Sequence, residues 1–146
     1  MKAVVWFRIS AAVLVLFAAG HTLGFLAFRP PTAEGLAVWN AMNSVHFTIN
    51  GATYTYGHFY TAFGLSITAS DLLGAWVAWV LEAMAQRGAA GVRMIAWGMV
   101  VWQAVGIVLA ATLIAAKPAV MSAVALLCLA TAASLARSEE QVAARV

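Results

Sequence analysis

The three histidines are the side chains with the widest chemical repertoire in this sequence. They are His21, His46 and His58, and a neutral imidazole can ligate a transition metal or a haem iron. One hypothesis is therefore a membrane redox protein that holds haem, or acts on a quinone, through His21 and His58. The alternative for His21 is a structural hydrogen bond between helices, because His21 is expected nearer in depth to Tyr60 than to His58.

Asp71 is the one acid that lies deep within an apolar stretch. An ionised carboxylate at that depth in a bilayer costs about 2.5 kcal/mol or more, so we expect a protonated acid or hydrogen bonds to Thr68 and Gln103. Asp71 and Gln103 could form the midplane site of a small proton-coupled transporter. The alternative is a purely structural hydrogen bond between helices.

No catalytic class is indicated by the remaining motifs. The sequence has no nucleophile motif, Gly-rich phosphate loop, cysteine pair or HExxH motif, and its single cysteine, Cys128, excludes an intramolecular disulfide. The eight basic residues are scattered between apolar segments and form no stripe, so nucleic acid is not an expected partner. We therefore expect no catalytic residues and no enzymatic activity.

The composition indicates that a lipid bilayer surrounds the chain. Of 146 residues, 64% are hydrophobic and 9% are charged, whereas soluble domains have about 45–50% and about 25%. Long apolar stretches that do not alternate must be helices in lipid. We predict an all-α, polytopic membrane protein with a single domain, an up-down-up-down bundle of four transmembrane helices. The predicted spans are about 4–28, 54–81, 94–116 and 118–136, with an outer cap at 29–53 and a cytoplasmic tail at 137–146.

The distribution of basic residues predicts the orientation. In a four-span protein, one side holds only Arg29 and Lys117, and the other holds six basic residues, so both termini are expected in the cytoplasm. Glu82, near the cytoplasmic end of its span, is the expected partner of one of these basic residues. The six are Lys2, Arg8, Arg87, Arg93, Arg137 and Arg145, of which Arg8, Arg87 and Arg93 are the candidates for Glu82.

A cleavable signal peptide is the alternative interpretation of the first apolar segment. Its positively charged region would hold only Lys2, and Arg8 would interrupt the apolar part. The charge-free run over residues 9–28 is longer than the usual apolar region of about 7–15 residues. We therefore expect this segment to remain as a membrane span.

The outer connection has the signals of a short helix followed by a hairpin. Thr32 follows Pro30-Pro31 and is a suitable N-cap, and Glu34 would lie in the first turn. Asn50-Gly51 separates two short extended pieces, which is typical of a tight hairpin turn. The helix is predicted from apolar and aromatic residues at helical spacing: Leu36, Trp39, Met42 and His46.

Small residues indicate which helix faces pack together. Gly20 and Gly24 flank His21 in the first span and form a pair that lets another backbone approach. In the second span, one face is small and polar along its whole length, and we expect it to be buried in the bundle or in a homo-oligomer. Its members are Gly57, Thr61, Gly64, Thr68, Asp71, Ala75, Ala78 and Glu82.

Three segments resemble the landmarks of a known family: residues 20–24 (GHTLG), His46-Phe47, and residues 59–65 (FYTAFGL). The resemblance is to a family of small uncharacterised bacterial four-helix integral membrane proteins, in which an acid stands at the position of His58. It implies an inner-membrane four-helix protein and directs attention to His21, His46, Phe59 and Tyr60. It implies no activity.

The leading hypothesis from the sequence is a ligand-binding membrane protein. Every histidine and tyrosine is predicted in the outer half of the bundle, beneath an aromatic cap. Such a polar outer vestibule would bind a small or lipid-like molecule. Its predicted ligand-binding residues are His21, His46, Tyr56, His58 and Tyr60.

Overall fold

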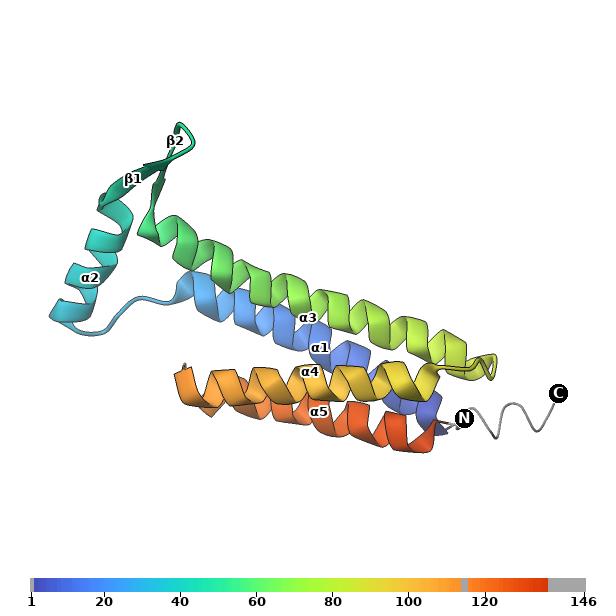
Figure 1. The fold of residues 1–146 in the computed structure, drawn as a ribbon. Coiled ribbons are helices and arrows are strands. Elements are labelled where there is room, and N and C mark those ends of the chain that lie inside the picture. Colours follow the sequence, from blue (N-terminus) through green and yellow to red (C-terminus); the bar gives the residue numbers. More distant parts are fainter. Residues whose placement is uncertain (1, 114–115, 137–146) are drawn as a thin grey trace. The chain divides into compact units, whose positions relative to one another are not determined.

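The structure is a computed structural model that describes residues 2–113 and 116–136, apart from the side chains of 116–118 (Figure 1). The described part is 83% helical, with five helices, which confirms the prediction of a helical protein. A single two-stranded hairpin lies between the second and third helices. The elements are α1 (Lys2–Ala27), α2 (Ala33–Ser44), β1 (His46–Ile49), β2 (Ala52–Thr55), α3 (Tyr56–Gln86), α4 (Val92–Leu113) and α5 (Ala116–Leu135).

Helices α1, α3 and α4 are long and apolar enough to cross a membrane. In α5, the apolar helix over 119–135 is shorter. The second span was predicted to begin at Tyr54, but Tyr54 and Thr55 belong to β2, and α3 begins at Tyr56. Lys117-Pro118 was predicted as a connection but lies in the first turn of α5, where proline is tolerated. The predicted tail at 137–146 lies outside the described residues.

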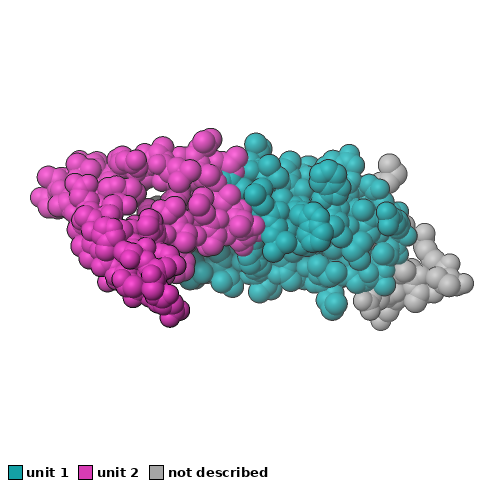
Figure 2. All heavy atoms as spheres, turned by 90° about the horizontal axis from the view of Figure 1, so that it is seen from above, with its two compact units in different colours: residues 1–18, 71–146 teal, residues 19–70 magenta. Residues whose placement is uncertain are grey.

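The chain divides into two compact units (Figure 2). Unit 1 comprises residues 1–18 and 71–146, and unit 2 comprises residues 19–70. Helices α1 and α3 therefore each contribute residues to both units.

Unit 1 has a close-packed core to which all four of its helices contribute. Leu14 of α1, Leu81 of α3 and Leu129 of α5 are at most 1% exposed, and α4 contributes Ala96. Large side chains face alanines, so the helices can approach closely. At Gly74 a Cβ atom would lie 2.6 Å from the Trp102 ring, so only glycine leaves room for this indole.

The predicted inward face of the second span is confirmed for most of its length. Asp71, Ala75, Ala78 and Glu82 are buried in unit 1, and Gly57 and Gly64 are buried in unit 2. Thr68 is half-buried and Thr61 is exposed. Burial of polar and charged residues on this face requires hydrogen-bond partners.

A glycine turn ends α3. The Ala89 N–H donates to the Met84 carbonyl at 3.0 Å, and the Gly88 N–H donates to the Ala85 carbonyl at 3.2 Å. This pair of bonds is the Schellman motif, which needs a left-handed residue at its centre. Gly88 has φ +67° and supplies it without a steric penalty.

Unit 2 contains the predicted helix and hairpin of the outer connection. The Thr32 hydroxyl accepts a hydrogen bond from the Gly35 N–H at 3.1 Å, which confirms the N-cap of α2. The two-residue loop Asn50-Gly51 has φ +51° and +80°, as a type I′ turn requires. His46 was predicted at the end of the helix but is the first residue of β1, because the helix stops at Ser44.

Candidate functional site

His58 is part of the N-terminal cap of α3. The His58 N–H donates to the Thr55 hydroxyl at 3.2 Å, and the Thr55 N–H donates to His58 Nδ1 at 3.3 Å. These reciprocal bonds form a capping box in which histidine stands where glutamate or glutamine is usual. Because a backbone N–H only donates, Nδ1 accepts, and a neutral His58 ring carries its proton on Nε2.

His21 joins α1 to α3 within unit 2. Its Nε2–H donates to the Gly64 carbonyl oxygen at 3.1 Å, which confirms the predicted structural hydrogen bond between helices. The Thr22 and Thr68 hydroxyls form a second link between the same helices at 2.8 Å. Thr68, which was predicted to bond Asp71, thus has Thr22 as a partner.

The His21 ring begins a series of ring contacts that we call the aromatic ladder, comprising His21, Phe25, Tyr60, Trp39 and Phe28. His21 stacks on Phe25 with ring centroids 5.8 Å apart, and Phe25 contacts Tyr60 at 5.0 Å. Trp39 of α2 meets Tyr60 edge to face at 5.6 Å. The ladder therefore fastens α2 to α1 and α3.

Arg29 completes the end of the ladder. Its guanidinium lies 5.3 Å from the centroid of the Trp39 ring, a cation–π contact. It also donates to the Phe28 carbonyl at 2.7 Å and to the Leu26 carbonyl at 3.3 Å. Arg29 thus provides a donor for the Leu26 carbonyl, which lies in the last turn of α1, and for the Phe28 carbonyl just after the helix.

A second group of rings, which we call the hairpin cluster, comprises Phe47, Tyr54, Tyr56, Phe59 and Phe63. Phe47 is at its centre and lies 5.1–6.1 Å from the rings of Tyr54, Tyr56 and Phe59. Phe47 and Tyr54 are brought together because they are direct partners in the β1–β2 register. The hairpin cluster was not predicted, because it depends on contacts between residues of the strands and residues of α3.

The predicted vestibule residues do not form one cluster. His21 and Tyr60 belong to the aromatic ladder, and Tyr56 belongs to the hairpin cluster. His46 is exposed and donates from Nδ1 to the Ser44 carbonyl at 2.7 Å, and His58 caps α3. Each of the three histidines makes a hydrogen bond to a backbone group: His21 to Gly64, His46 to Ser44 and His58 to Thr55.

These hydrogen bonds bear on the haem hypothesis. To ligate iron through Nε2, His21 would have to give up its bond to Gly64. His58 would have to use Nε2, because Nδ1 is engaged with Thr55. Among the described residues, no group of three or more His, Cys, Asp or Glu side chains is placed to hold a metal ion.

The four predicted packing glycines differ in their surroundings. A Cβ atom at Gly64 would overlap the Phe25 ring, and one at Gly57 would overlap the Asn43 side chain, so both positions confirm close packing. At Gly20 and Gly24, no described atom would lie within 4 Å of a Cβ. The described structure therefore shows no close packing at these two glycines, and their role as a packing pair stays a prediction.

The polar pair predicted within the membrane lies in unit 1. Asp71 is 5% exposed and Gln103 is 3% exposed. Gln103 Nε2 makes no hydrogen bond to any described residue, so the predicted bond from Gln103 to Asp71 is not present. Among residues 2–113 and 119–136, no group accepts a hydrogen bond from the buried amide of Gln103.

Glu82 pairs with Arg8, which is one of its three predicted partners. Its Oε1 accepts from Arg8 Nε at 3.1 Å and from Arg8 Nη2 in a shorter contact. Gln86 Nε2 also donates to the same oxygen at 2.9 Å. Glu82 is 10% exposed in its side chain whereas Arg8 is 71% exposed, so the carboxylate is the buried member of the pair.

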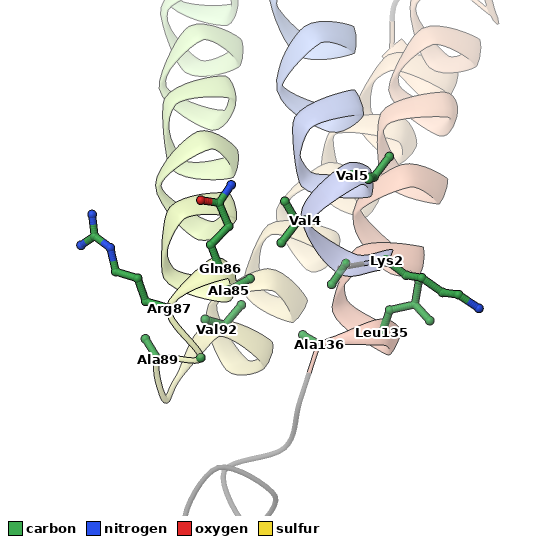
Figure 3. Close-up of a pocket in the computed structure, with 12 residues that line it drawn as sticks. Lys2, Val4, Val5, Ala85, Gln86, Arg87, Ala89, Val92, Leu135 and Ala136 are labelled. Carbon is green, nitrogen blue, oxygen red and sulfur yellow. The ribbon is translucent and has the colours of Figure 1, made fainter. Parts of the chain in front are cut away.

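Unit 1 also contains a cavity of about 620 Å³, where the first turn of α1 meets the end of α3, the α3–α4 turn and the end of α5 (Figure 3). The cavity exists because most of the residues that line it have small side chains. Its apolar wall includes Ala3, Val4, Ala85, Ala89, Val92 and Ala136. Lys2, Gln86 and Arg87 add polar groups, and Figure 3 shows Lys2 and Arg87 pointing away from each other on opposite sides.

Comparisons with known proteins add no relative. No family model matches the chain, and neither does any curated protein or solved structure. The functional argument therefore rests on the residues and their geometry.

Proposed function

We propose that this protein is an integral membrane protein that binds a neutral, lipid-like molecule on the hairpin cluster, without catalysing a reaction on it. In this proposal α5 is a fourth span, and both termini lie in the cytoplasm of a bacterial cell. The excess of basic residues on the predicted cytoplasmic side supports this orientation. The hairpin cluster then lies at the outer face of the inner membrane.

The observation that carries the proposal is the exposure of aromatic rings in unit 2. Within residues 19–70 no hydrophobic side chain is buried, in contrast to the packed core of unit 1. In the hairpin cluster, Tyr54, Tyr56, Phe59 and Phe63 are 41–70% exposed. A contiguous exposed apolar patch of this kind marks a surface for lipid, ligand or protein.

The charge of unit 2 favours a neutral ligand. Residues 19–70 contain only two charged side chains, Arg29 and Glu34, of opposite sign. Arg29 is already engaged by Trp39 and by the carbonyl groups of Leu26 and Phe28. The exposed Tyr54 and Tyr56 combine an aromatic face with a hydroxyl, which suits a molecule with an apolar body and an uncharged polar end.

Photolabelling of the purified full-length protein tests this proposal. A neutral lipid with a diazirine on its acyl chain should label peptides from residues 46–63, and Phe59→Ala/Phe63→Ala should reduce labelling by about tenfold. The matched control is Leu23→Ala/Leu26→Ala, which removes side chains that are 72% and 52% exposed in the same unit but outside the cluster.

Two outcomes would contradict the proposal. Equal loss of labelling in both double variants would show that any exposed apolar surface of unit 2 suffices. A dimer in native mass spectrometry that is lost in Phe59→Ala/Phe63→Ala would show that a second copy of the chain covers the cluster instead.

A further inference from the structure

The cavity of unit 1 is independent of the surface proposed above and has features of a binding site for an amphiphile. Its volume of about 620 Å³ lies within the range of about 300–1,000 Å³ typical of ligand sites. Ala3, Val92 and Ala136 in its wall are at most 8% exposed, so this wall is both apolar and part of the folded core. An acyl chain fits such a wall better than a polar solute does.

The two charged side chains among the described residues that line the cavity are both basic. Lys2 and Arg87 lie on opposite sides of the cavity, and no acidic residue is among the described residues that line it (Figure 3). Glu82, one turn before Ala85 in α3, is engaged by Arg8 and Gln86. The described side chains that line the cavity therefore carry a net positive charge.

The helix ends at the cavity have opposite signs, because the N-terminus of α1 lines it together with the C-terminal ends of α3 and α5. Residues 2–5 line the cavity and form the first turn of α1, whose N–H groups have no acceptor within the helix. The positive end of the helix dipole lies at the same place. Lys2 is unfavourable for the helix at this position, so its charge adds to the potential of the rim at a cost to α1.

We propose that this cavity binds an anionic phospholipid, with an acyl chain against the apolar wall and the phosphate at the rim, toward which the long side chains of Lys2 and Arg87 turn from the directions that Figure 3 shows. A basic pocket at the ends of membrane helices is a recognised arrangement for anionic head groups. The rule that places positive residues on the cytoplasmic side accounts for the two charges. It does not account for a cavity between them.

Lipid retention by the purified full-length protein tests this proposal. Native mass spectrometry is carried out after incubation with phosphatidylglycerol or phosphatidylcholine of identical acyl chains. We expect preferential retention of phosphatidylglycerol. Its affinity should fall about fivefold for Lys2→Gln or Arg87→Gln alone and roughly thirtyfold for both together, as expected for two cations near a head group.

Two further variants separate the parts of the site. Ala85→Leu fills the cavity without changing charge and should also abolish the preferential retention, because the acyl chain loses its place. Arg29→Gln removes a cation of unit 2 that is not among the residues that line the cavity, and should leave retention unchanged. Circular dichroism establishes that each variant keeps its helices.

The result that would overturn the proposal is equal retention of both lipids, or unchanged preference in Lys2→Gln/Arg87→Gln. Retention that survives Ala85→Leu would show that the lipid binds outside the cavity. Displacement of the lipid by glycerol phosphate at equal concentration would show that the site takes the free phosphate ester, and the lipid assignment would be wrong.

Discussion

Substitution of Gly64 by alanine gives a direct measure of how closely α1 and α3 pack in unit 2. A Cβ atom at this position would overlap three atoms of the Phe25 ring, and that ring also contacts His21 and Tyr60. The ring cannot move without disturbing the aromatic ladder. Gly64→Ala should therefore be destabilising, although alanine favours the helix.

The magnitude follows from two opposing effects. Replacing a helical glycine by alanine stabilises by about 0.5–1 kcal/mol, and adding a methyl group to a packed contact costs about 1–3 kcal/mol. Gly24→Ala is the matched control, because no described atom would lie within 4 Å of its Cβ. The free energies of unfolding of the two variants should differ by about 1–3 kcal/mol, with Gly24→Ala the more stable.

Hydrogen exchange provides the local readout for this comparison. The protein in detergent is exposed to deuterated buffer, and protection is followed at the amides of residues 60–68. Gly64→Ala should lose protection there, because the His21–Gly64 and Thr22–Thr68 hydrogen bonds lie in this part of α3. Titration with SDS followed by circular dichroism gives the global stability.

A double-mutant cycle identifies the cause. In a Phe25→Leu background, Gly64→Ala should be nearly neutral, because the clashing ring atoms are gone. Equal stability and equal protection of Gly64→Ala and Gly24→Ala would refute the packing of Phe25 on Gly64. Strict additivity with Phe25→Leu would refute it as well.

Three further substitutions test the polar groups. Gln103→Leu removes a buried donor without a described partner, so it should leave the free energy of unfolding unchanged or raise it by up to about 3 kcal/mol. A decrease of more than about 1 kcal/mol in SDS titration would show that the amide is bonded. Arg8→Met should destabilise more than Glu82→Leu, since it leaves the buried carboxylate without its cation whereas Arg8 is exposed; the reverse order would contradict this. His58→Gln should retain the capping box, whereas His58→Ala should lower the free energy of unfolding by about 1 kcal/mol and speed hydrogen exchange at the Thr55 amide. Equal stability and equal exchange in the two variants would show that the box contributes nothing.

Features determined by neighbouring residues could be predicted from the sequence. The N-cap at Thr32 and the turn at Asn50-Gly51 depend on side chain to backbone bonds and backbone dihedral angles within four residues. The inward face of α3 was predictable because helical periodicity places Ala75, Ala78 and Glu82 on one side. These signals need no knowledge of the tertiary structure.

Other features depend on contacts that the pattern does not contain. The capping box of His58 was missed because the second span was expected to start before Thr55, and because histidine is not a usual residue at this position. The Thr55-x-x-His58 spacing was the available signal. The hairpin cluster depends on the register that brings Phe47 beside Tyr54 and on the packing of β1 against α3.

The cavity of unit 1 was not predictable for a different reason. Its wall comes from the ends of four helices and a turn, and most of the residues there are ordinary alanines and valines. The cavity forms only where these helix ends come together in the folded protein. The predicted vestibule fails for the opposite reason. Its residues are of suitable type for a binding site, but they do not converge, and the three histidines bond to backbone groups instead.

The contrast between a packed unit 1 and a unit 2 without buried hydrophobic side chains has a consequence for how the sequence can change. In unit 1, positions such as Leu14 and Leu129 are constrained by volume, because each fills a defined space among alanines. At exposed positions of unit 2, such as Leu23 and Phe63, many apolar residues would serve the fold equally well. Mutational tolerance along α1 and α3 should therefore change at residues 18–19 and 70–71, within uninterrupted helices.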